Sequence, residues 1–138
     1  KMKKQEKCFQ AVDGRMLKVV HRKSALLFEL TEDAKGYKFS FHFDAETFRA
    51  LIQHIDESAA ASWDKLVIKE ADSFGNDYWE YYSKELDNNG YLSIKPLLLD
   101  VERPALESLE LYKFNKAKMG TFLFDARACV EKMKVVHA

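Results

Sequence analysis

The chain has little of what marks membrane-spanning, secreted and disulfide-stabilised proteins. Its 138 residues include only two cysteines. Cys8 and Cys129 lie at opposite ends of the sequence without CxxC or metal-ligand spacing, which is typical of reduced, structural thiols. The longest uncharged apolar runs are four or five residues, and no apolar stretch follows the basic start as it would in a signal peptide. The sequence therefore predicts a cytoplasmic protein with no membrane contact.

Catalytic and metal-binding signatures are also missing. The chain has no GxSxG, P-loop or GxGxxG segment, and its four histidines form no HxH or HExxH pattern. His42 and His54 each precede an aspartate by two residues. However, Asp44 suits the start of a helix and His54 the exposed end of one, so neither pair indicates acid–base chemistry. The sequence predicts no enzyme activity, no cofactor and no metal.

The chain has no net charge, but its basic and acidic residues are strongly segregated along the sequence. The formal net charge is zero. Residues 1–23 carry a balance of +6 and residues 111–138 a balance of +4, whereas residues 24–55 sum to −2 and residues 56–110 to −8. A neutral chain can therefore still bind a polyanion, provided that its two basic ends share one face.

What the sequence does contain is one short stretch that occurs twice. Phe41–Ala45 reads FHFDA, and Phe122–Ala126 reads FLFDA 81 residues later, each followed by a helix-like run. We expect both copies to be junctions of a strand with a helix, with Asp44 and Asp125 as N-caps. The four phenylalanines of the two copies should then face one core: Phe41, Phe43, Phe122 and Phe124.

The first half is predicted to hold four strands and a helix. Alternating apolar residues and turn signals indicate strands over Cys8–Val12, Met16–Lys23, Ala25–Leu30 and Tyr37–Phe43. Asp13-Gly14 is a strong hairpin turn signal. After Asp44, apolar side chains recur at helical spacing, at Phe48, Leu51, Ile52 and Ile55. The alanine-rich stretch 58–62 could extend this helix.

The second half is predicted to repeat this order with a surplus strand. Strands are expected over Leu66–Ala71, Tyr78–Leu86, Tyr91–Glu102, Leu106–Phe114 and Met119–Phe124. Because Pro96 lacks an amide hydrogen, it should lie at a sheet edge or a bulge. The helix expected after Asp125 carries Cys129, Val130, Met133 and Val136 on its apolar side.

This order, together with the recurring FxFDA segment, resembles the Whirly and Pur-alpha group of nucleic-acid-binding proteins. The resemblance implies a single α+β domain of two β-β-β-β-α repeats, about residues 7–57 and 64–136, with antiparallel sheets. It also implies single-stranded DNA or RNA laid across exposed sheet faces. The alternative fold is an OB-fold-like β-barrel with added helices, which would bind a similar ligand.

The residues themselves give a separate argument for that ligand. Single strands are held by aromatic rings that stack on bases and by cations that contact phosphates. The segment 78–84 carries aromatic side chains on both strand faces, so some of its rings should be exposed. The rings predicted to stack are Tyr78, Trp79, Tyr81, Tyr82 and Tyr112, and the phosphate contacts are predicted from Lys18, Arg22, Lys23, Lys84, Lys113, Lys116 and Lys118.

Two other interpretations stay open at this point. Tyrosine is common in strands, where its ring covers sheet edges without any ligand. The acidic region from Asp64 to Glu110 could instead be the blocking surface of a protein-binding inhibitor, such as an immunity or anti-defence module. The sequence decides neither between DNA and RNA nor whether the chain forms a homo-oligomer.

Overall fold

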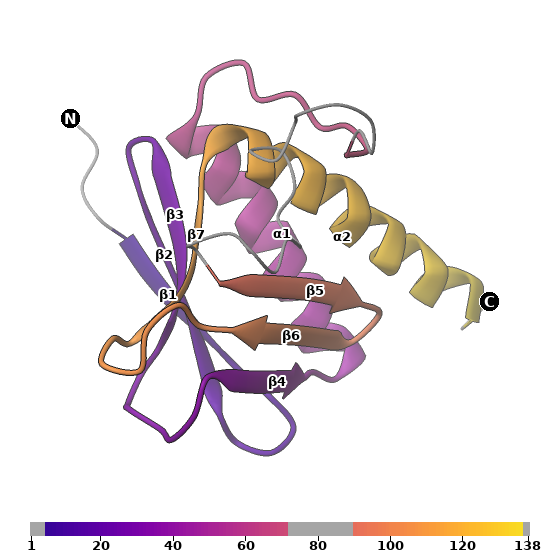
Figure 1. Ribbon diagram of the computed structural model, residues 1–138. Helices are drawn as coiled ribbons and strands as arrows, with labels where there is room; N and C mark the ends of the chain where they lie inside the picture. The colour runs from indigo at the N-terminus through magenta and orange to yellow at the C-terminus, as the bar shows by residue number, and fades with distance from the viewer. Residues whose placement is uncertain (1–4, 72–89, 137–138) are drawn as a thin grey trace.

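The computed structural model describes residues 5–71 and 90–136, which form two antiparallel sheets and two helices (Figure 1). In chain order the elements are β1 (Gln5–Gln10), β2 (Met16–Arg22), β3 (Ala25–Leu30), β4 (Lys38–His42), α1 (Ala45–Ser62), β5 (Tyr91–Lys95), β6 (Leu98–Glu102), β7 (Glu110–Phe114) and α2 (Lys116–Val136). The predicted α+β class is confirmed. The described strands form two sheets with distinct edges, and not the closed barrel of the alternative fold.

The larger sheet, called sheet A, has the strand order β1-β2-β3-β7. The β1–β2 turn closes at Gly14, whose φ of 96° suits glycine, and β2 and β3 are joined by the two-residue turn Lys23-Ser24. Alternation along the strands gives the sheet a predominantly apolar face, here called its inner face, while the outer face carries only a small buried cluster of Val20, Ala25 and Leu27. That face carries the buried residues Phe9, Leu17, Val19, His21, Leu26, Phe28, Leu30, Tyr112 and Phe114.

The smaller sheet, called sheet B, has the strand order β4-β6-β5. Its buried face carries Phe39, Phe41, Leu92, Leu99 and Val101. The opposite face is polar and is built from cross-strand rows, of which the first joins Lys38, Glu102 and Tyr91 and the second joins Ser40, Asp100 and Ser93. One face of sheet B therefore belongs to the core, and the other presents hydrogen-bonding groups.

The two halves of the chain exchange strands. β4 comes from the first half but pairs with β6, and β7 comes from the second half but pairs with β3. In Figure 1 the strands of sheet B cross those of sheet A steeply, and the β6–β7 connection leads from sheet B to sheet A. Neither half therefore completes a sheet from its own strands within the described residues.

Helix α1 forms as the apolar spacing predicts. Asp44 is its N-cap, and its Oδ1 accepts the amide hydrogen of Thr47 at an N–O distance of 2.7 Å, which lowers the pKa of the carboxyl. The helix continues through the alanine-rich stretch to Ser62. Its predicted apolar residues are all buried, in one core cluster with the inner faces of both sheets: Phe48, Leu51, Ile52 and Ile55. Neither of the two described helices contains an apolar stretch that could span a bilayer.

The second FxFDA segment is not a strand-to-helix junction, so this prediction was wrong. Residues 119–126 lie within α2, which begins at Lys116, directly after β7. Asn115 takes the place expected for Asp125, since its Oδ1 accepts the amide hydrogen of Lys118 at 2.7 Å. Phe122 is buried as expected, but Phe124 is 39% exposed. The two segments are similar in sequence but differ in local structure.

The other four strand predictions of the second half were not confirmed as made. Leu66–Ala71 has no strand structure. The long strand expected over Tyr91–Glu102 is a hairpin, because Pro96 begins a two-residue turn between β5 and β6 and Leu97 follows with a φ of 69°. The last strand before α2 is shorter than expected, since β7 begins only at Glu110. The strand expected over Tyr78–Leu86 lies outside the described residues.

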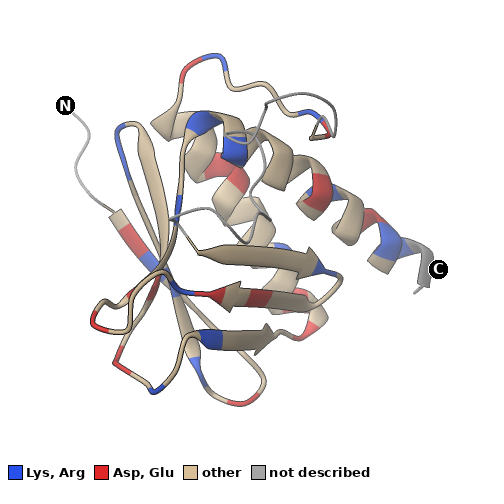
Figure 2. Cartoon of the chain, in the orientation of Figure 1, with Lys and Arg blue, Asp and Glu red and all other residues tan. Residues whose placement is uncertain are grey.

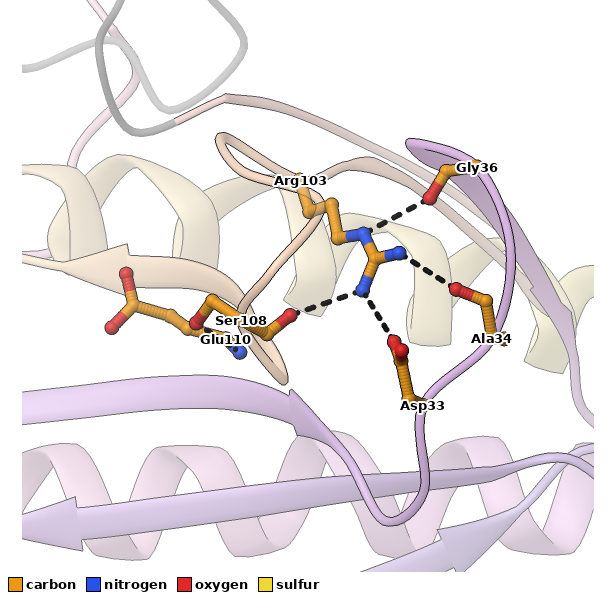
Figure 3. Close-up of polar contacts among 6 residues, drawn as sticks. All are labelled: Asp33, Ala34, Gly36, Arg103, Ser108 and Glu110. Atoms are coloured by element: carbon orange, nitrogen blue, oxygen red, sulfur yellow. Dashed lines mark hydrogen bonds and ion pairs between the residues drawn. The ribbon is translucent and has the colours of Figure 1, made fainter.

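A buried arginine joins two loops at the end of the molecule opposite the β2–β3 turn. Arg103 is 2% exposed and follows β6. Its guanidinium donates to the backbone oxygens of Ala34 (2.7 Å) and Gly36 (2.9 Å) and to Asp33 Oδ1 (3.2 Å), all in the β3–β4 loop (Figure 3). A further bond reaches the backbone oxygen of Ser108 at 3.0 Å, in the β6–β7 loop. The arginine therefore fixes both loops to the end of sheet B.

Candidate functional site

Seven of the twelve residues predicted to bind nucleic acid lie in the described part of the chain, and they do not form one surface. Tyr78, Trp79, Tyr81, Tyr82 and Lys84 lie outside the described residues. The seven are Lys18, Arg22, Lys23, Tyr112, Lys113, Lys116 and Lys118. Their positions divide them into a buried pair, a group at one end of the molecule, and a pair on the outer face of sheet A.

Two of the seven are core residues, which corrects their predicted role. Tyr112 is fully buried with its ring 4.8 Å from that of Phe114, and burial raises the pKa of its hydroxyl. Lys118 is 5% exposed, with Nζ 6.0 Å from the centre of the Tyr112 ring, and burial lowers its pKa. A ring without exposed faces cannot stack on a base. The apparent hairpin tip at 112–118 is in fact the β7–α2 junction.

Four exposed cations gather where the β2–β3 turn meets the ends of both helices; we call this set the basic end. Its members are Arg22, Lys23, Lys65 and Lys116. Figure 2 shows basic residues at the tip of the β2–β3 hairpin and at the start of α2, on the same end of the molecule. Three of the four were predicted from the sequence, and Lys65 was not.

Backbone contacts hold the basic end together. The amide of Ser24, next to Lys23, donates to the carbonyl of Ser62 at 3.0 Å, which attaches the β2–β3 turn to the end of α1. Leu26 pairs with Phe114, so the chain enters α2 beside the same turn. Segments more than 90 residues apart in sequence thus place their cations together, which concentrates positive potential at one end.

Lys18 and Lys113 lie instead on the outer face of sheet A. Lys18 Nζ is 3.4 Å from a carboxylate oxygen of Glu29 and 3.8 Å from one of Glu6. Its charge is therefore balanced within the sheet. Lys113 pairs across the ladder with Leu27 and is exposed. Sequence reasoning placed these lysines in the same set as Arg22 because strand spacing alone does not reveal acidic neighbours on adjacent strands.

The polar face of sheet B contains a hollow that sequence reasoning missed. Its volume is about 310 Å³, and its polar lining is Lys38, Ser40, Tyr91, Asp100 and Glu102. Ser40 Oγ donates to Asp100 Oδ1 at 2.5 Å, and Lys38 Nζ is 3.9 Å from Glu102 Oε1. The alternation of polar residues along β4 was visible in the sequence. However, β6 was hidden inside one long predicted strand, so its pairing with β4, which places Asp100 beside Ser40 and Glu102 beside Lys38, could not be predicted.

The described residues contain one serine–histidine contact. His54 Nε2 is 3.3 Å from Ser58 Oγ, one turn apart on α1. Ser58 is 3% exposed, so a substrate cannot reach its hydroxyl in this conformation. Within the described ranges, no three histidine, cysteine or acidic residues are placed to hold a metal ion.

Comparison of the chain with models of known protein families, with curated proteins and with solved structures gave no match.

Proposed function

We propose that the protein binds single-stranded nucleic acid, DNA or RNA, and that the basic end supplies phosphate contacts. The observation that carries the proposal is the convergence of Arg22, Lys23, Lys65 and Lys116 from three separate segments on one exposed end. Lysine and arginine contacts to phosphates position a strand without reading its bases. Binding should therefore depend strongly on salt and weakly on sequence.

Base stacking in this proposal comes from the aromatic segment of the sequence. Tyr78, Trp79, Tyr81 and Tyr82 remain the predicted stacking rings, and Tyr112 no longer belongs to the set because its ring is buried. Loss of one stacking ring should weaken binding by about 1–3 kcal/mol.

The test is a fluorescence anisotropy titration with labelled oligonucleotides of about 30 nucleotides, longer than the roughly 16 that one small binding domain covers. Single-stranded DNA, single-stranded RNA and duplex DNA are compared at two salt concentrations. We expect tighter binding to a single strand than to the duplex, and a steep loss of affinity as salt rises. No anisotropy change with micromolar protein at low salt would end this proposal.

Charge-matched variants locate the contacts. Lys23→Ala combined with Lys116→Ala removes two cations from the basic end. Lys35→Ala combined with Lys132→Ala removes two exposed cations elsewhere and leaves the same net charge. If both basic-end lysines contact phosphates, the first pair should flatten the slope of log K against log salt by about 1.4. Equal effects of the two pairs would mean that net charge, and not the basic end, drives binding.

The hollow on sheet B favours a second candidate function, the binding of a basic protein segment. Its lining holds two carboxylates, Asp100 and Glu102, against one lysine, and both belong to the acidic region of the sequence. Nucleic acid would be repelled from this face, whereas an arginine or lysine side chain of a partner would find acceptors there. A protein partner whose binding is lost in Asp100→Asn but unchanged in the Lys23 and Lys116 variant would favour this function.

A further inference from the structure

Two histidine rings lie next to each other between sheet A and α1. His21, on the inner face of β2, is 4% exposed, and His54, on α1, is half-buried. The ring centres are 6.1 Å apart in an edge-on arrangement, and the ring of Phe9 lies 5.5 Å from that of His54. A titratable pair thus occupies a position in the helix–sheet interface that is otherwise filled by apolar side chains.

The surroundings of the pair offer little compensation for positive charge. β1 contributes Lys7, a cation whose field lowers the pKa of His54, and β3 contributes the apolar Leu26 opposite His21. On α1, Ser58 contacts His54, and Glu57 is the one carboxylate in the described residues whose field favours the charged ring. Among the residues that the structure describes, His21 Nδ1 has no hydrogen-bond partner. A proton on the His54 ring would therefore face a lysine, a second histidine and a single carboxylate, and a proton on the His21 ring would be buried.

The sign of the effect follows from these neighbours. Burial is the largest cause that lowers the pKa of both histidines, and for His54 the positive charges of Lys7 and His21 add to it. The folded protein then binds fewer protons than the unfolded chain, in which a histidine has a pKa of about 6.5. Stability from the neutral pair is fully present above that pH and is lost as the pH falls through and below it.

The position of the two histidines determines which part of the structure would open on protonation. The β2–β3 turn is attached to the end of α1 through Ser24 and Ser62, three residues after His21 and eight after His54. Sheet B and the Arg103 loops lie outside this interface. We propose that His21 and His54 form an acid-sensitive latch whose protonation releases the C-terminal half of α1 from the β2–β3 hairpin. This inference does not depend on nucleic-acid binding.

Hydrogen–deuterium exchange of the full chain at pH 7.5 and pH 5.5, corrected for intrinsic exchange rates, tests the latch. Protection should fall in peptides that cover residues 16–30 and 50–62 and remain in peptides that cover β4 and β6. If opening takes up one proton, the equilibrium constant for opening should rise about tenfold for each unit by which the pH falls below about 6.5, until the pH reaches the lowered pKa of the folded state. A uniform loss of protection, or none, would overturn the proposal.

Neutral substitutions assign the response. His21→Asn and His54→Gln should each reduce the difference between the two pH values, whereas His42→Gln, an exposed histidine on β4, should leave it unchanged. Should a latch variant fail to fold, the ring-proton NMR signals of the unaltered chain give a second measurement. Both buried rings should titrate below about 6.5. Rings that titrate at or above that value would refute the latch.

Discussion

Arg103 shows how one residue can hold two loops through backbone acceptors more than through an ion pair. Three of its four hydrogen bonds reach carbonyl oxygens, of Ala34, Gly36 and Ser108. Its guanidinium carbon also lies 5.2 Å from the centre of the Phe39 ring. Asp33, the one acidic partner, has a side chain that is 72% exposed. Solvent therefore screens the ion pair, and the carbonyl contacts provide most of the stabilisation.

We expect Arg103→Lys to lower the free energy of unfolding by about 2–4 kcal/mol, because an ammonium group cannot reproduce a planar fork of four bonds. Asp33→Asn is the control and should cost less than about 1 kcal/mol. Urea denaturation measures both. Equal losses in the two variants would place the stabilisation in the ion pair instead.

Gly120 marks a second residue-scale constraint, a close approach of the chain to a helix. A Cβ at this position of α2 would overlap the carbonyl oxygen of Val67. The segment around Val67 crosses α2 where only glycine leaves room for its backbone. This contact also gives a reason why Leu66–Ala71 is not a strand, since its backbone packs against a helix.

We expect Gly120→Ala to destabilise the protein by about 1–3 kcal/mol through overpacking, although alanine is favoured over glycine by about 1 kcal/mol in a helix. The matched control is Ala128→Gly at an exposed position of α2, which should cost about 1 kcal/mol from helix propensity alone. Thermal melts compare the two. A higher melting temperature for Gly120→Ala would contradict the close approach.

At the scale of elements, α1 is held by its apolar stripe. Phe48 is completely buried and lies with its ring centre 6.5 Å from that of Phe43, at the end of β4. Phe48→Ala should therefore lower the free energy of unfolding by about 3–5 kcal/mol, the usual cost of a large-to-small change in a core. Arg49→Ala, the exposed neighbour, should change it by less than about 0.5 kcal/mol. A melting shift of only a degree for Phe48→Ala would show that the stripe is not packed.

The sequence predicted elements well where the signal was local. Three strands of the first half and the helix after Asp44 followed from alternation, helical spacing and a capping residue, whereas β1 spans Gln5–Gln10 and not the predicted Cys8–Val12. The prediction failed at Met119–Phe124, where aromatic and β-branched residues favour a strand by propensity. Most of those side chains are buried by tertiary packing of α2, although Phe124 is partly exposed, and Asn115, not Asp125, supplies the cap. Strand propensity is a weak guide to secondary structure where tertiary packing buries the side chains.

At the scale of the whole molecule, the candidate site could be predicted only in part. The positive ends of the chain were visible in the sequence, but their convergence depends on the pairing of β3 with β7 and on the Ser24–Ser62 contact. Lys118 points into the core and Lys18 is balanced by Glu6 and Glu29. Such differences between equally charged residues depend on neighbours that are distant in sequence, and composition carries no information about them.

The exchange of strands between the halves has a consequence for synthesis of the protein. Sheet A closes only when β7 reaches the edge of β3, and about 80 residues separate Leu30 from Glu110. At roughly 5–20 residues per second, a ribosome needs several seconds to cover that distance. During this time the nascent chain displays an unpaired β3 edge and an α1 stripe without its final partners. During this interval the unpaired strand edge and the apolar stripe are the surfaces that a chaperone would bind. A chain truncated before β7 would keep both surfaces exposed.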